Sequence, residues 1–182
     1  MKFSIVSLTG AVVLAAACSG EPATEEIDAE AQPAAATTQP QLPDTTVESV
    51  WSMLTEAGYQ DTWTVWPGLG EYYSGNEPHG MLLTTYLNDV ALAALNSGAD
   101  RMPTGAVLVK DNFMPDSTLA ATTVMVKRET AYNPEHNGWW WLKRNADGSV
   151  DAAGRATGCQ NCHGGVADND YIFSGPLSGG DR

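Results

Sequence analysis

The chain has 182 residues, of which nine are basic and 22 are acidic, and its formal net charge is −13. This charge excludes a surface built to bind the phosphate backbone of nucleic acids and favours basic protein partners. The chain has three cysteines and three histidines, so sites for metals and cofactors are confined to a few positions.

Residues 1–17 have the pattern of an export signal. Lys2 precedes an apolar run that is too short to span a bilayer as a mature helix. Cys18 follows three alanines, and we predict that it becomes the lipidated first residue of an exported protein, anchored to a membrane on the periplasmic side. Leu14 lies one position before the place where lipoprotein signals carry leucine, so ordinary cleavage without a lipid is the alternative.

Residues 18–44 are predicted to form a disordered tether after the lipidated cysteine. Ser19 to Asp44 contains six acidic residues, four prolines and no lysine or arginine. Such a segment cannot bury enough apolar surface to offset its ordering entropy. Residues 45–182 are therefore predicted to form one domain, which carries a net charge of −8 and is long enough to enclose a cofactor.

Two short helices are predicted in the domain. Residues 46–57 have apolar side chains at helical spacing, with Thr45 or Thr46 as N-cap and Gly58 as the stop. A second helix is predicted to begin after its N-cap, Asn88, and to end at Gly98.

The remaining segments favour strands. Four runs rich in β-branched and aromatic residues begin at Met81, Gly105, Ala121 and Gly138, and residues 145–150 contain an Asp-Gly turn signal. Few helices among several strands joined by short turns predict an α+β domain with an antiparallel sheet and flanking helices.

The sequence GCQNCHGG at residues 158–165 carries the main chemical signal. A zinc site would need ligands beyond Cys159, Cys162 and His163, and a thioredoxin-like site would need the cysteine pair early in a βαβ unit. Covalent attachment of haem c uses the whole motif, since the two thiols bond to the porphyrin and the histidine becomes an axial iron ligand. We therefore predict one covalent haem c, with the sixth iron position open or filled from upstream.

The order of segments resembles the cytochrome P460 family, which includes the β-sheet cytochromes c′. The likeness covers residues 63–68, 78–95, 102–134, 138–150 and 158–174. The strand GAVLVK at residues 105–110, with the Asn-capped helix before it, is the most specific part. The resemblance implies a homodimer and a five-coordinate haem whose free side takes small nitrogen ligands.

Lys110 matches the lysine that is bonded covalently to the porphyrin in P460, so the resemblance implies the same cross-link here. From the residues alone, strand alternation places Ala106, Leu108 and Lys110 on one face. A lysine that extends to solvent from the end of the strand is the alternative to a lysine that reacts.

The resemblance also bears on the free side of the iron. Hydroxylamine-oxidising members place a basic residue and a carboxylate there, but Leu83 stands at the basic position and Gly158, not an acid, precedes the first haem cysteine. These departures weigh against an enzyme and leave ligand binding untouched. His79 is the candidate distal base or sixth ligand, with an ordinary turn histidine as the alternative; Met125 is a second candidate ligand, with a core role as the alternative.

Trp139, Trp140 and Trp141 alternate in direction along a predicted strand. We predict that at least one packs in the core or against the haem edge and that the others cover a dimer surface.

Three functions follow from these predictions. The first is a hydroxylamine-oxidising oxidoreductase that passes electrons to a small cytochrome. The second is binding or scavenging of nitric oxide without turnover. The third is a plain electron carrier whose iron is closed by His79 or Met125. We favour chemistry of small nitrogen species at an open haem iron, with the lipid anchor as the protein's link to the membrane.

Overall fold

The computed structural model describes residues 42–177. The chain divides into two units, Met1–Thr37 and Thr38–Arg182, and all described residues belong to the second. The predicted signal segment, the lipidation site Cys18 and the tether up to residue 41 lie outside the described residues. Within residues 42–177, no helix combines the length and apolar character needed to cross a membrane.

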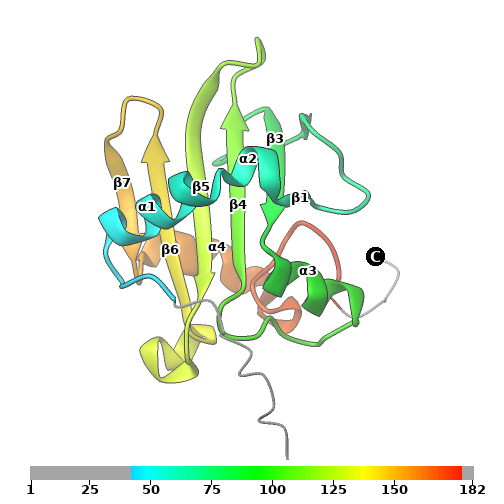
Figure 1. Ribbon diagram of the computed structural model, residues 1–182, viewed down its shortest axis with the longest axis vertical. Helices are drawn as coiled ribbons and strands as arrows, with labels where there is room; N and C mark the ends of the chain where they lie inside the picture. The colour runs from blue at the N-terminus through cyan, green and yellow to red at the C-terminus, as the bar shows by residue number, and fades with distance from the viewer. Residues whose placement is uncertain (1–41, 178–182) are drawn as a thin grey trace, which may run out of the picture. The chain divides into compact units, whose positions relative to one another are not determined.

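The fold is built on a seven-stranded antiparallel sheet with strand order β1-β3-β4-β5-β6-β7, and β2 pairs with β3 outside this path (Figure 1). The predicted α+β class is therefore confirmed. The strands are β1 Thr64–Val65, β2 Tyr73–Ser74, β3 Leu82–Leu87, β4 Val107–Phe113, β5 Leu119–Lys127, β6 Trp139–Asn145 and β7 Val150–Gly154.

Helices flank both faces of this sheet. In Figure 1, α1 and α2 cross one face while α4 lies behind the sheet. The helical segments are α1 Val47–Ala57, α2 Tyr59–Thr62, α3 Asp89–Asn96 and α4 Thr157–His163, with the 3-10 segments η1 Thr130–Tyr132, η2 Pro134–His136 and η3 Gly164–Asn169.

The predicted helix caps are mostly confirmed. The Thr46 side chain accepts a hydrogen bond from the Ser49 amide, and Gly58 ends α1 in a left-handed conformation. The Asn88 side chain caps α3 and also accepts from the Val107 amide, so this asparagine joins the helix to the start of β4. The second helix ends at Asn96 with Ser97 as its cap, two residues earlier than predicted.

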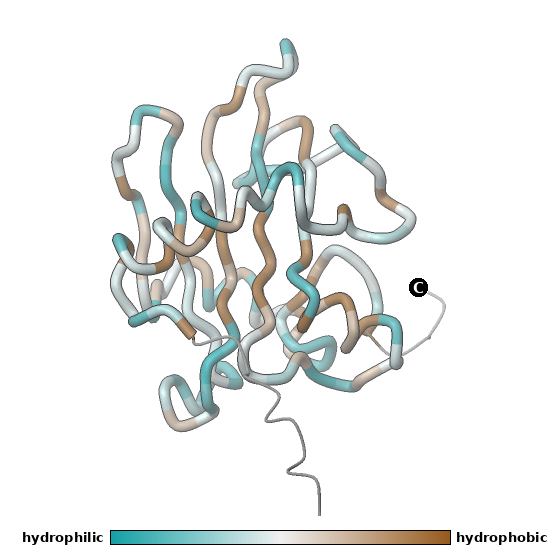
Figure 2. The backbone as a smooth tube through the Cα atoms, in the orientation of Figure 1, coloured by the Kyte–Doolittle hydropathy of each residue, from teal (hydrophilic) through white to brown (hydrophobic). Residues whose placement is uncertain are grey.

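The two faces of the sheet bury separate apolar clusters, and Figure 2 shows hydrophobic stretches along the central strands of the sheet. Val107 and Val109 pack with α1, whereas Leu108 packs on the α4 side. The tryptophans of β6 follow the same alternation, with Trp140 on the α1 side and Trp139 and Trp141 opposite.

All three tryptophans are at most 2% exposed. The prediction that at least one packs in the core is confirmed. The prediction that the others cover a dimer surface is wrong, because each face of β6 is already covered by elements of the same chain. Leu42 and the Pro43 carbonyl, which accepts from the Arg128 guanidinium, help to cover the α1 side.

Gly138 is a glycine whose replacement we expect to be costly, because it combines a positive φ with a close approach to backbone. Its φ is +80°, and an added Cβ would lie 2.5 Å from the Arg128 carbonyl oxygen. Gly58, with φ +57° and open space around it, is a matched control. We expect Gly58→Ala to lower the free energy of unfolding by about 1 kcal/mol and Gly138→Ala by about 3 kcal/mol or more. Urea unfolding measures both, and equal losses would contradict the steric account.

Candidate functional site

The cysteine–histidine motif lies on α4, on the face of the sheet opposite α1. A helix brings residues three and four positions apart to the same side, so Cys159, Cys162 and His163 all line one cavity. Both cysteines are unpaired thiols. Burial raises the pKa of the Cys159 thiol, so it is held in its neutral form.

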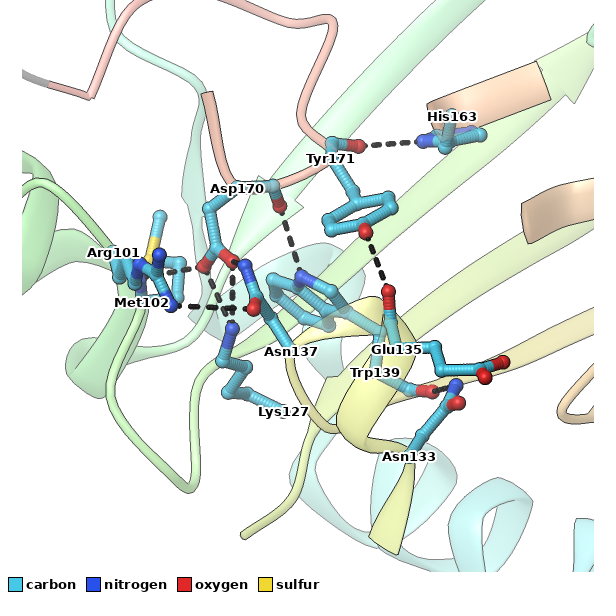
Figure 3. Close-up of polar contacts among 10 residues, drawn as sticks. All are labelled: Arg101, Met102, Lys127, Asn133, Glu135, Asn137, Trp139, His163, Asp170 and Tyr171. Atoms are coloured by element: carbon cyan, nitrogen blue, oxygen red, sulfur yellow. Dashed lines mark hydrogen bonds and ion pairs between the residues drawn. The ribbon is translucent and has the colours of Figure 1, made fainter. Parts of the chain in front are cut away.

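His163 is oriented by its surroundings and is 7% exposed. Its Nδ1 lies 2.6 Å from the Tyr171 carbonyl oxygen (Figure 3). A carbonyl can only accept, so Nδ1 carries the proton and Nε2 keeps its lone pair for a metal. The ring centres of Trp141 and Phe173 lie 4.6 and 5.2 Å, respectively, from the centre of the imidazole ring. Burial lowers the pKa of His163, which favours the neutral, metal-binding form.

The cavity has a volume of about 640 Å³, within the range of cofactor pockets. Strands β4, β5 and β6 form one wall and α4 another, and residues 172–174 contribute as well. The wall from the sheet is largely apolar, with Leu108, Met125 and Trp141. Met125 therefore lines the cavity and also packs against the core cluster on this face.

Lys110 enters the same cavity from β4. It follows Leu108 on the cavity face, as strand alternation predicted. No ion pair with its ammonium group occurs among residues 42–177. Burial lowers the pKa of Lys110 to about 8, so its amine is unprotonated far more often than that of an ordinary lysine.

His79 reaches the cavity from the loop between β2 and β3. Its ring centre lies 6.0 Å from that of His163, with the planes at 83°. Its Nδ1 lies 3.4 Å from the Thr123 hydroxyl. Burial lowers the pKa of His79 to about 4, with smaller contributions from the charges of Lys110 and His163. The imidazole is therefore neutral near neutral pH.

Two buried polar atoms on this face lack hydrogen-bond partners among the described residues: the Trp141 indole Nε1 and the Asn112 side-chain oxygen. Trp141 lines the cavity. A buried donor without a partner costs free energy, and a polar group on a cofactor in the cavity would supply that partner.

The structure also shows what sequence reasoning missed. Asp151 on β7 is the only carboxylate among the described residues that line the cavity, and it pairs with Lys143 at 3.1 Å. Leu83 pairs with Asn112 in the sheet but is not part of the cavity lining. No local pattern marks Asp151, because its place depends on the pairing of β7 with β6.

The site fits a haem better than the alternatives. Among residues 42–177, no three His, Cys, Asp or Glu side chains converge as a zinc site requires. A thioredoxin-like site is excluded as well, because α4 follows the edge strand of an antiparallel sheet. Two thiols, a neutral imidazole and an apolar cavity with an unpartnered donor match the needs of haem c.

The comparisons with known proteins agree with this geometry. A family model described as Cytochrome P460 matches residues 57–174. The match spans the whole sheet, α4 and every residue that lines the cavity. A search of curated proteins found no match.

Proposed function

The chain belongs to the cytochrome P460 family and is a haem c cytochrome of that type, and from this premise we propose that it binds a small nitrogen species, hydroxylamine or nitric oxide, at the haem iron. When bound, the haem supplies an iron that coordinates such a ligand and exchanges electrons with it. The observation that carries the proposal is the single cavity that brings the motif of α4 together with Lys110 and His79.

The residues of α4 would hold the cofactor. We assign the Cys159 and Cys162 thiols to thioether bonds, each formed by adding S–H across a vinyl group, so that no oxidant is needed. His163 would bind the haem iron through Nε2, which the contact of Nδ1 with the Tyr171 carbonyl leaves free. The Trp141 indole is available to donate to a polar group of the cofactor.

His79 is the residue we assign to the incoming nitrogen ligand. Its neutral imidazole can accept a proton from hydroxylamine or exchange a hydrogen bond with bound nitric oxide. Asp151 is the one carboxylate among the described residues that line the cavity, but it is engaged by Lys143. Oxidation of hydroxylamine, with a small cytochrome as electron acceptor, is the enzymatic form of the proposal. Scavenging of nitric oxide without turnover is its non-enzymatic form.

A second candidate, the plain electron carrier, is favoured by one distance. Two imidazoles on opposite sides of one metal, each with a metal–nitrogen bond of about 2 Å, have ring centres about 6 Å apart. The ring centres of His79 and His163 are 6.0 Å apart. In this candidate His79 closes the iron and no small ligand binds.

The spectrum of the ferrous protein separates the two candidates. With an open iron, carbon monoxide and nitric oxide each shift the absorption bands on mixing. An unchanged spectrum after exposure to both gases would replace the proposal with the electron carrier. Consumption of hydroxylamine with a cytochrome acceptor then distinguishes the two forms of the proposal.

Lys110 is proposed to form a bond from its amine nitrogen to a porphyrin carbon. An N–C bond would replace one N–H and one C–H bond, which is a two-electron oxidation, and we assign a peroxide as the oxidant. The low pKa of Lys110 favours the reactive unprotonated amine.

Peptide mapping of the denatured protein tests this bond. In the wild type and in Lys143→Met, we expect the haem to join the peptide that contains residue 110 to the Cys159–Cys162 peptide. In Lys110→Met, we expect the haem to be bonded to the Cys159–Cys162 peptide alone. Lys143 is the matched control, because it lines the same cavity but is paired with Asp151. A wild-type haem bonded to the cysteines alone would contradict the cross-link.

Export, lipidation at Cys18 and assembly as a homodimer complete the proposal. Export and lipidation are supported by the pattern of residues 1–18, and the homodimer by the family resemblance. The domain is acidic, which suits a basic electron acceptor.

A further inference from the structure

The carbonyl that orients His163 belongs to an unusual piece of backbone. Asp170 and Tyr171 are consecutive non-glycine residues with positive φ, 50° and 68°. The left-handed conformation is unfavourable for residues other than glycine, so surrounding contacts must hold the pair in place. This backbone directs the Tyr171 carbonyl oxygen at His163 Nδ1, at 2.6 Å.

Asp170 supplies those contacts through its carboxylate, whose polar contacts are drawn in Figure 3. This side chain is fully buried. Both carboxylate oxygens accept from the Lys127 ammonium at 2.8 Å. One oxygen also accepts from the Asn137 amide at 3.0 Å, and the other from the Met102 backbone amide at 2.8 Å. The Asp170 carbonyl accepts from the Trp139 indole at 2.9 Å.

These donors come from three separate parts of the fold. Lys127 is the last residue of β5, Asn137 precedes β6, and Met102 lies in the segment between α3 and β4. The Lys127 ammonium is further held over the Trp139 ring, 4.6 Å from its centre. Tyr171 adds one anchor of its own, since its hydroxyl donates to the Glu135 carbonyl at 2.9 Å. The segment that carries the Tyr171 carbonyl is therefore fixed to the sheet.

We infer that Asp170, held by Lys127 and Asn137, is a positioning residue for the axial histidine: it fixes the Tyr171 carbonyl and thereby sets the strength of the hydrogen bond from His163 Nδ1. A stronger bond at Nδ1 makes the imidazole a more basic ligand and stabilises ferric over ferrous iron. This inference rests on the axial role proposed for His163.

The test compares three variants of the exported, haem-loaded protein. Asp170→Asn removes the charge that holds Lys127. Asn137→Gly is milder, because Asn137 already has a φ of +52°, which glycine adopts freely. The change removes only the side-chain amide, which donates to Asp170 and accepts from the exposed Arg101. Asp111→Asn is the matched control, since Asp111 is an equally buried carboxylate with three donors, Tyr59, Gln60 and Thr122, that packs on the α1 side of the sheet.

Two readouts report on the axial ligand without turnover: the midpoint potential and the iron–histidine stretching band of the ferrous protein. We expect Asp170→Asn to shift the redox equilibrium toward ferrous iron by roughly tenfold, which is about 59 mV for one electron, and to lower the stretching frequency. Asn137→Gly should shift both in the same direction by less, and Asp111→Asn should shift neither.

The outcomes separate this inference from the axial assignment beneath it. If the ferrous wild-type protein binds carbon monoxide, so that its iron is open, and yet shows no iron–histidine band, the axial role of His163 itself is refuted. A wild-type band that stays in place in both Asp170→Asn and Asn137→Gly overturns the positioning role, as does an equal shift in Asp111→Asn. If Asp170→Asn does not fold, Asn137→Gly alone decides.

Discussion

A variant in which Cys159 and Cys162 are both replaced by alanine in a Lys110→Met background, which removes the proposed cross-link, is expected to release its haem into acidified organic solvent, whereas Lys110→Met alone keeps its haem with the protein. The thioether bonds are covalent and survive denaturation, while the bond from His163 to iron is reversible. Each single cysteine variant should keep the haem through the remaining thioether. The measurement is the absorbance left in the protein after extraction.

Cys18→Ser is the control for this experiment. It removes the third cysteine, which we assign to lipid, and should leave haem attachment unchanged. Haem that stays with the variant lacking Lys110, Cys159 and Cys162, or that is lost from the Cys18 variant, would contradict the assignment of the three thiols.

Replacing His79 with phenylalanine is expected to have the largest effect on the chemistry of the nitrogen ligand. Loss of a positioned general base lowers turnover of hydroxylamine by about 10²-fold or more. Loss of one hydrogen bond weakens nitric oxide binding only by about tenfold. Steady-state kinetics and ligand dissociation rates measure the two effects separately.

Met125→Leu is the matched variant, because Met125 also lines the cavity and leucine has a similar volume. It should change neither turnover nor the ferric spectrum. If Met125→Leu alters the spectrum and His79→Phe does not, the methionine rather than the histidine lies at the iron.

Much of the fold could be predicted from the sequence because its signals are local. The side chains of Thr46 and Asn88 each cap a helix by accepting a hydrogen bond from the backbone amide three residues further along the chain. Gly58 takes the left-handed conformation that ends α1. The turn before β7 follows from Asp147, which accepts from Ser149, and from Gly148 with φ +89°. Strand alternation placed Lys110 on the face that carries the cavity, without any information about its partners.

The short and edge elements could not be predicted in the same way. Strands β1 and β2 have two residues each, too few to show a period. Strand β7 has no buried residue, so it lacks the apolar alternation of a half-buried strand. Its place is fixed by pairing with β6, and this pairing brings Asp151 to the cavity.

The contacts that orient His163 could not be predicted from the sequence either, because they join residues far apart in the chain. Asp170 meets Lys127 only because η3 brings the chain back to the end of β5. The error over the tryptophans has a related cause. Alternation predicted their two directions correctly, but it could not show that α1 and the 171–177 segment cover both faces.

The mass of the denatured, exported protein tests the central claim most directly. The account predicts a polypeptide that carries one haem and has neither Cys159 nor Cys162 open to alkylation. A mass equal to the polypeptide alone, with both thiols alkylated, would contradict it.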